Sequence, residues 1–133
     1  MKRARRLGLF MMLVGALAVG GCFLFPNLAP EAAFTVNYNT VENEPFIVEL
    51  DASASSSPDG DEIEAYMWTF GDDVNIITPL DATKTVLIKV LTVKYPVEGE
   101  YTVTLAVREK PRQAGEPGKV STPVSETITL PNG

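Results

Sequence analysis

The 133-residue sequence contains no histidine and only one cysteine, Cys22. Without histidine, the chain cannot form a Ser–His–Asp or Cys–His catalytic arrangement, or a histidine-based zinc centre. A single cysteine also leaves no disulfide within the chain to stabilise a fold. Packing and hydrogen bonding therefore have to hold the folded state together.

Basic charge is also scarce, with 11 Lys and Arg against 17 Asp and Glu and a formal net charge of −6. Four of the basic residues fall within residues 1–21 and none of the acidic ones do, so the remainder carries a formal charge of about −10. Such a body repels DNA, RNA and anionic lipid headgroups. The charge excludes nucleic-acid binding.

The N-terminal segment has the composition of an export signal. Four basic residues precede an apolar run from Leu7 to Val19, which is followed by "AVGGC". The small residues before Cys22 resemble a lipobox, where bacterial lipoproteins are lipidated on cysteine and cleaved just before it. We predict a lipoprotein signal peptide at 1–21, a lipidated N-terminus and spacer at 22–32, and a lipid-anchored, extracytoplasmic location at the cell membrane. The alternative is an uncleaved membrane helix, because a segment of roughly 20 residues could just span a bilayer. Which membrane carries the anchor stays open.

After residue 30 the pattern is one of short β-strands, and no segment has the periodicity of a helix. Apolar residues alternate with polar ones in the strands, as in Tyr101, Val103, Leu105 and Val107. The alternation slips by one residue near Val90, which predicts a bulge there or two strands with a bend. The segments with this pattern are "FTVNY", "PFIVELDAS", "EAYMWTF", "TVLIKVLTVKYP", "EYTVTLAVRE" and "PVSETITLP".

Several motifs in order resemble those of a PKD domain, the immunoglobulin-like module named for polycystic kidney disease. They are the stretches "LDASAS", "SPDGD", "WTFGD", "KY" and "GEYTVTL". The resemblance covers about residues 33–130 and implies an all-β, immunoglobulin-like antiparallel β-sandwich with Greek-key connections. Asp73 stands where the family usually has glycine.

Four residues are expected to be structural. Trp68 and Phe70 share a face of one strand and are predicted to lie in the core, with Gly71 in the turn that follows. Tyr101 resembles the tyrosine corner of Greek-key sandwiches, in which the hydroxyl bonds to nearby backbone. Gly99, two residues before Tyr101, permits a positive φ.

Aspartates in two turns, Asp59, Asp61, Asp72 and Asp73, are candidate ligands for calcium if the turns meet at one end of the sandwich. Some PKD domains of secreted bacterial enzymes bind calcium, which supports this hypothesis. However, the loop lacks the glutamate of an EF-hand, because the twelfth position from Asp59 is Phe70. Turn formation, in which aspartate side chains accept hydrogen bonds from nearby backbone, is favoured, so we expect no cofactor.

The same residues argue against an enzyme. A glycosidase needs two carboxylates roughly 5–10 Å apart across a cleft. Asp72 and Asp73 are adjacent, so on a strand they would point to opposite faces. A sandwich of this size also leaves little room for a deep cleft. We expect a non-catalytic protein.

The expected function is binding or structural support at the cell envelope. PKD modules mediate contacts with proteins or carbohydrates, so the resemblance implies an envelope or secreted protein as partner. A carbohydrate-binding accessory that holds polysaccharide or cell-wall glycan is the alternative. An exposed aromatic strip would favour glycan, and an exposed apolar patch or open strand edge would favour protein.

Overall fold

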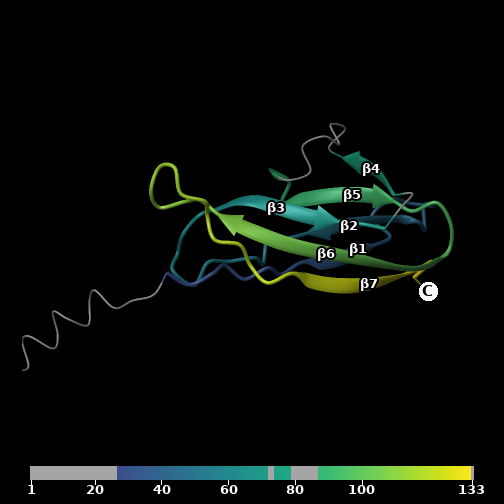
Figure 1. The fold of residues 1–133 in the computed structure, drawn as a ribbon. Helices are drawn as coiled ribbons and strands as arrows, with labels where there is room; N and C mark the ends of the chain where they lie inside the picture. The colour runs from purple at the N-terminus through teal and green to yellow at the C-terminus, as the bar shows by residue number, and fades with distance from the viewer. Residues whose placement is uncertain (1–26, 72–73, 79–86, 133) are drawn as a thin grey trace, which may run out of the picture.

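The computed structural model describes residues 27–71, 74–78 and 87–132, which form two packed antiparallel sheets (Figure 1). Within these ranges the chain forms no α-helix. The strands are β1 (Thr35–Tyr38), β2 (Ile47–Asp51), β3 (Ile63–Thr69), β4 (Asn75–Thr78), β5 (Val90–Lys94), β6 (Gly99–Glu109) and β7 (Val124–Leu130).

The strand order identifies the type of sandwich. One sheet has the order β1-β2-β5-β4 and the other the order β3-β6-β7. Lettered A to G along the chain, these are the ABED and CFG sheets of a constant-type immunoglobulin domain. The prediction of an all-β, immunoglobulin-like antiparallel sandwich is confirmed.

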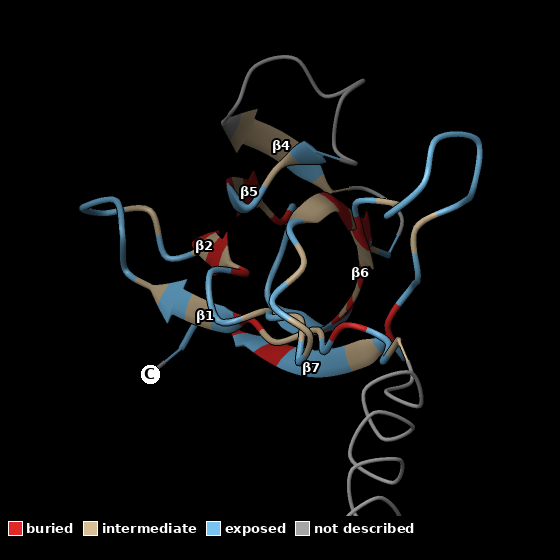
Figure 2. Cartoon of the chain, turned by 90° about the vertical axis from the view of Figure 1, so that its left-hand side faces the viewer, coloured by how far each residue is buried: buried red, intermediate tan, exposed pale blue. Residues whose placement is uncertain are grey.

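The core follows from the alternation of side chains along each strand. In β6, Val103, Leu105 and Val107 are fully buried, whereas Thr102 and Thr104 lie on the outer face. Figure 2 shows the buried positions as red segments on strands of both sheets, among them β2, β5, β6 and β7. Each fully buried Val or Leu contributes about 1.5–3 kcal/mol through the hydrophobic effect, so the alternation fixes which face of each strand points inward.

The slip in the pattern near Val90 marks the start of a strand. β5 begins at Val90 and pairs with β2 without interruption, from Asp51 opposite Val90 to Ile47 opposite Lys94. Ile88 precedes the strand and packs partly buried against the core. No bulge interrupts this pairing, so the predicted bulge is wrong for the strand from Val90 onward. Part of the segment before it, residues 79–86, lies outside the described residues, so the alternative of two strands with a bend stays a prediction.

A register shift occurs instead where β4 pairs with β5, between Ile76 and Thr78. β4 was not predicted from the sequence. This strand has only four residues and lies at the edge of its sheet, so its pattern is too short to indicate a strand.

The sandwich has two ends that differ in structure. β6 runs the full length, from Gly99 at one end to Glu109 at the other. The proximal end contains the first described residues and the distal end contains the last ones (Figure 1). The proximal end comprises residues 27–33, 52–62 and 110–123, and the distal end comprises residues 39–46, 95–98 and 131–132.

Candidate functional site

Two of the predicted calcium ligands meet at the proximal end, around an arginine. Arg112 Nη2 lies 2.9 Å from Asp61 Oδ2 and 3.5 Å from Asp59 Oδ2. The hydrogen bond to Asp61, together with the negative charges of both aspartates, raises the pKa of Arg112. Asp59 Oδ2 also accepts a hydrogen bond of 2.6 Å from the backbone N–H of Leu28. A guanidinium therefore provides the positive charge that these carboxylates need.

Residues 28–33, which we call the N-terminal strap, are joined to the loop between β2 and β3. Glu31 and Ser56 exchange two backbone hydrogen bonds, of 2.7 and 3.0 Å. Ser55 Oγ accepts a bond from the N–H of Ala33 at 3.0 Å and donates one to its carbonyl at 2.9 Å. These bonds satisfy the backbone of a segment that belongs to neither sheet.

A buried carboxylate supports the same end of the sandwich. Glu109 is 1% exposed, and Ser57 Oγ donates to its Oε2 at 3.2 Å. The backbone N–H of Glu109 donates to the carbonyl of Lys119, which folds the loop after β6 back onto the strand. A Cβ at Gly118 would lie 1.6 Å from the Glu109 carbonyl oxygen, so only glycine fits at that crossing.

Asp51, just after which the same loop begins, forms a turn of its own. Asp51 Oδ1 accepts a 2.8 Å bond from the N–H of Ser53, two residues on, which is an Asx-turn. Hydrogen bonds from the Ser53 side chain and backbone lower the pKa of Asp51. Gly60 has φ +75°, in the left-handed region that glycine adopts without strain. An Asx-turn at Asp51 and a left-handed glycine at position 60 therefore shape the loop between β2 and β3.

The other two candidate calcium ligands, Asp72 and Asp73, lie outside the described residues. Their neighbours Gly71 and Val74 follow the end of β3, whereas Asp59 and Asp61 precede its start. In the described ranges, no group of three or more His, Cys, Asp or Glu side chains is placed to hold a metal ion. The four-aspartate site therefore stays a prediction.

Trp68 and Phe70 lie against the core, with Trp68 9% exposed. The Trp68 ring meets Phe34 edge to face, with 5.2 Å between centroids, and is stacked with Phe70 at 6.4 Å. Its Nε1–H donates to the carbonyl of Ile88 at 2.9 Å, which connects β3 to the segment before β5 in the other sheet. Gly71 is exposed, and a Cβ added at this position would meet no atom within 4 Å.

Tyr101 forms the corner at the distal end. Its hydroxyl donates a 2.6 Å hydrogen bond to the carbonyl of Val97, four residues earlier, and Gly99 between them has φ +152°. The Tyr101 ring packs on Tyr95, with 4.2 Å between centroids. Tyr95 is fully buried, and its hydroxyl has no hydrogen-bond partner among the described residues. Burial is the main cause that raises the pKa of Tyr95 to about 12.

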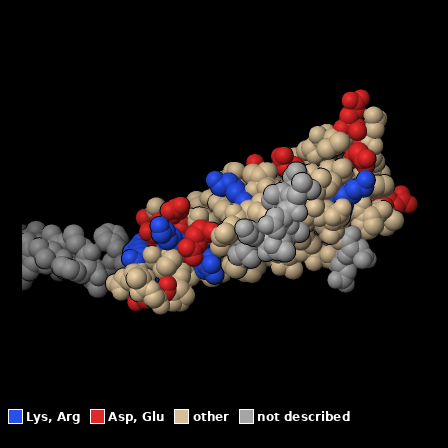
Figure 3. Space-filling view, turned by 90° about the horizontal axis from the view of Figure 1, so that it is seen from above, with Lys and Arg blue, Asp and Glu red and all other residues tan. Residues whose placement is uncertain are grey.

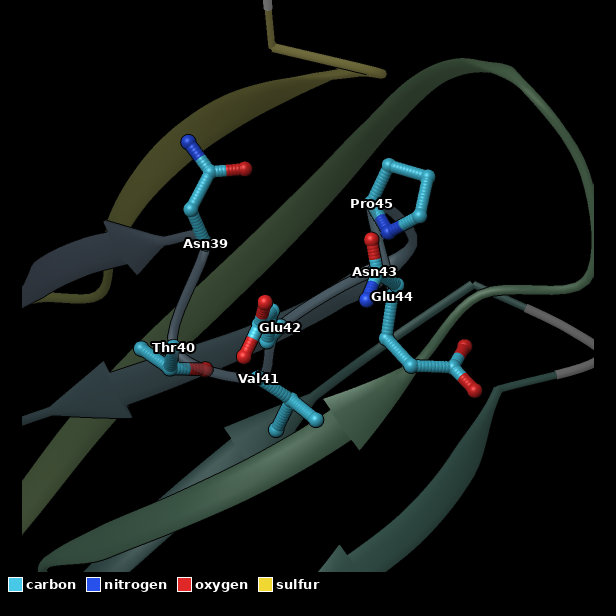
Figure 4. Close-up of a pocket in the computed structure, with 7 residues that line it drawn as sticks. All are labelled: Asn39, Thr40, Val41, Glu42, Asn43, Glu44 and Pro45. Carbon is cyan, nitrogen blue, oxygen red and sulfur yellow. The ribbon is translucent and has the colours of Figure 1, made fainter.

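The loop between β1 and β2 borders an open hollow of about 540 Å³ at the distal end (Figure 4). Two carboxylates line it, but Figure 4 shows the Glu44 side chain extending away from Glu42. Glu44 Oε2 pairs with Lys94 Nζ of β5 at 3.1 Å. All the lining residues belong to residues 39–45 of one loop, so no second element faces the carboxylates across this hollow.

Exposed apolar side chains in the described ranges are aliphatic rather than aromatic. The large ones that are exposed are Leu28, Val41, Leu87, Val90, Val97 and Val120. The four tyrosines and the tryptophan instead lie in or against the core. An aromatic strip for stacking on sugars is therefore absent from the described surface.

The predicted lipidation residue, Cys22, lies outside the described residues. In the ranges that the structure does describe, no helix has the length and apolar character needed to cross a membrane.

Two residues that organise the proximal end, Arg112 and Ser55, were not predicted from the sequence. Three acidic residues in one loop, Asp59, Asp61 and Glu62, indicate that a counter-charge is needed. However, Arg112 lies 51 residues beyond Asp61, and only the folded structure brings the two together.

The fold and these contacts define an immunoglobulin-like module of the constant type. Comparison with known families is consistent with this, since the PKD domain family matches residues 27–122. The chain belongs to the PKD domain family, whose members are associated with protein–protein or carbohydrate contacts.

A solved structure shares this fold. It is described as a nucleoside hydrolase-related hypothetical protein from Saccharophagus degradans that is associated with carbohydrate metabolism. The TM-score is 0.51 and the sequences are 23% identical over 77% of this chain. The match spans 26% of that protein's length, so the likeness concerns the fold of one part. No curated protein matches the chain at a significant level.

Proposed function

We propose that this chain is a lipid-anchored, extracytoplasmic PKD module that binds an envelope or secreted protein and catalyses no reaction. The observation that carries the choice of a protein partner is the aliphatic character of the exposed apolar residues. Glycan binding relies on exposed aromatic rings, whereas protein interfaces also use aliphatic contacts surrounded by polar groups. A cofactor is not part of the proposal.

The distal end has the surface chemistry expected of such an interface. Val97 is 59% exposed and Val41 is 43% exposed, each in a loop at this end. Glu42, Glu98 and Glu100 are exposed in or beside the same loops. We therefore propose a partner that presents basic and apolar side chains, because opposite charge speeds the encounter and apolar contact stabilises the complex.

The anchor places this end away from the membrane. The strap at the proximal end is only a few residues from Cys22 along the chain. If Cys22 is lipidated, the distal loops are held on the opposite side of the domain and face the partner. The motif "AVGGC" carries this part of the proposal.

Site-specific photo-crosslinking in intact membranes tests the choice of partner. A photoreactive amino acid at Val97 should crosslink the full chain to another protein. The same amino acid at Val120, a comparably exposed valine at the proximal end, should not. Equal labelling at both positions, or none at Val97, would contradict a distal protein interface. Binding to purified polysaccharide or cell-wall glycan would instead support the carbohydrate alternative.

Lipidation has its own test. Cells that express the full chain and are fed a labelled fatty acid should incorporate the label into the wild type and not into Cys22→Ser. Uncleaved or mislocalised precursor should accumulate in the variant. Label in Cys22→Ser would mean that the lipoprotein interpretation is wrong.

A further inference from the structure

One edge of β7 is open in the part of the chain that the structure describes. All seven residues of β7 pair with β6, and no backbone group on the other edge of β7 bonds to a described residue. Pro123 and Pro131 bound this open edge, and neither has the N–H group that a further strand could use. A strand edge of this kind is a template on which one more strand can pair.

Glu126 is a charged residue on the inward face of this edge strand. It pairs with buried Val103 of β6 and alternates along β7 with Val124 and Ile128, which both pack on the core. Glu126 itself is exposed, so its carboxylate lies at the open margin of the sandwich. Among the described residues, no basic side chain forms an ion pair with it.

An open hollow of about 290 Å³ lies beside the same edge, between the strap and the start of β7. It is lined by Pro30, Glu31 and Ala32 of the strap and by Thr122 and Val124. Pro30 is buried, and Ala32 and Val124 pack on the core, so much of the lining is apolar. Figure 2 shows β1, into which the strap leads, next to β7 on one side of the sandwich. A side chain placed opposite Val124 on an added strand would therefore reach this hollow.

We propose that the open edge of β7 binds an extended segment of a partner protein, which adds a strand to the β3-β6-β7 sheet. The segment carries a basic side chain opposite Glu126 and, two positions along, an apolar side chain opposite Val124. Side chains directly opposite each other on neighbouring strands have Cβ atoms about 4.5–5.5 Å apart, within reach of an ion pair. Main-chain hydrogen bonds give such a segment affinity, and the alternate side chains give it specificity.

The charge of this edge favours a basic partner over a second copy of the chain. Two copies paired through β7 would bring two Glu126 carboxylates close together on two acidic bodies. Figure 3 shows basic side chains next to acidic ones at both ends of the molecule, where Lys94 pairs with Glu44 and Arg112 with Asp61. An inward-pointing charge keeps unsuitable strands from pairing with an edge, so the same carboxylate excludes acidic segments and selects basic ones.

This edge is separate from the distal loops of the proposed function, and it does not depend on the lipid anchor. Val120, the proximal position in the crosslinking experiment, pairs with Arg108, and the neighbours of Arg108 in β6, Val107 and Glu109, point inward and are buried. Val120 therefore lies on the outer face of the sheet, away from Glu126. Failure of the distal interface would leave the β7 edge to be decided by its own experiment.

Binding of a designed peptide to the full chain tests the proposal. The peptide has seven residues, as β7 does, with threonine at the odd positions, valine at the second and sixth, and lysine at the fourth. Its sequence is symmetric about the lysine, so it fits the edge in either strand direction. At ten times its Kd, the peptide should slow hydrogen exchange about tenfold at every second amide of β7 and leave the distal loop 39–46 unchanged. Unchanged exchange in β7 at this concentration would overturn the proposal.

Charge reversal separates the ion pair from general attraction to an acidic protein. Glu126→Lys should weaken binding of the lysine peptide at least about tenfold and should bind a peptide with glutamate at the fourth position instead. Glu116→Lys is the matched control, because it makes the same change in net charge at an exposed glutamate in the loop after β6. It should bind the lysine peptide within about twofold of the wild type. Equal losses in the two variants would overturn the ion pair.

Three further measurements examine the strand, the hollow and the occupant. The same peptide N-methylated at its third and fourth residues should not bind, because successive N–H groups point to opposite edges and one of them is needed in either register. Serine in place of both valines should weaken binding at least about tenfold, since the hollow then loses its apolar contact. Binding of either peptide as tightly as the parent would contradict strand addition with an apolar anchor. Slower exchange in β7 as the chain itself is concentrated, with no peptide present, would identify a second copy as the occupant and overturn the choice of a basic partner.

Discussion

The two ends of this sandwich are built in different ways. At the proximal end, the strap and both loops are linked by side chains, with Asp59, Arg112 and Ser55 as the main connections. At the distal end, the loops are held mainly by the Tyr101 corner and the Lys94–Glu44 pair, and two valines are exposed.

This difference separates two tasks within one small domain. A linked end resists local opening, because several groups have to separate together. Both ends expose aliphatic side chains, Leu28 and Val120 at the proximal end and Val41 and Val97 at the distal end, but fewer side-chain bonds hold the distal loops. The distal loops therefore have more freedom to adjust to another molecule. The residues that hold the domain together therefore differ from the residues that we propose for binding.

The largest effect is expected for Trp68→Ala, which removes the core shared by both ends. The change should lower the free energy of unfolding by about 3–5 kcal/mol, because it leaves a cavity between Phe34 and Phe70 and removes the hydrogen bond to Ile88. Urea unfolding measures the loss. Met67→Ala, at a half-buried neighbour, should cost less than about 1 kcal/mol. An equal cost for the two variants would contradict the core position of Trp68.

Alkaline pH should weaken the distal core specifically. The folded state raises the pKa of Tyr95 from 10.0 to about 12, so deprotonation favours the unfolded chain. The stability that this group contributes is fully present below about pH 10 and is lost as the pH rises towards 12, by about 2–3 kcal/mol. Unfolding curves measured between these pH values should show the loss in the wild type and a smaller one in Tyr95→Phe. Identical pH dependence in both proteins would refute this account.

At the proximal end, Ser55→Ala should leave the backbone N–H and carbonyl of Ala33 without their partner. We expect a loss of about 1–3 kcal/mol in the free energy of unfolding. Ser56→Ala is the control, because exposed Ser56 bonds to Glu31 through its backbone, which the substitution keeps. Chemical denaturation compares the two variants. If Ser56→Ala is the more costly change, the Ser55 hydroxyl is not what stabilises this end.

The two distal tyrosines should respond oppositely to loss of the hydroxyl. Tyr101→Phe removes the bond to Val97 and should cost about 0.5–1.5 kcal/mol. Tyr95→Phe removes a buried hydroxyl that has no partner among the described residues, so it should be neutral or stabilising. Thermal melts of both variants give the comparison. A destabilised Tyr95→Phe would mean that its hydroxyl has a partner, such as a buried water.

The smallest effect concerns calcium. Millimolar calcium should shift the melting temperature by no more than about one degree, because Arg112 already supplies positive charge to Asp59 and Asp61. A shift of several degrees that EDTA reverses, and that Asp72→Asn abolishes, would show a metal site. The proximal and distal turns would then need to be compared again with the ion bound.

The sequence determined the class of fold because the inward residues of most strands recur at every second position. Val48 and Leu50 are two positions apart, so both are buried only when their shared face of the strand points to the core. The same holds for Val103 and Leu105. The Tyr101 corner was also predictable, since its partner is four residues away and Gly99 lies between them. Local patterns of this kind need no knowledge of the rest of the chain.

Only the tertiary structure decided which positive charge Asp59 and Asp61 meet. They stay candidate metal ligands, and the fold places Arg112, 51 residues beyond Asp61, against both of them. The four-residue β4 likewise becomes recognisable as a strand only through its pairing with β5. The role of Ser55 also depends on the fold, because its hydroxyl bonds to the backbone of Ala33. These contacts join residues that are distant along the chain, and chain order alone does not fix their distance in space. The physical reason is that a side chain's role depends on which charges and polar groups folding brings within reach of it.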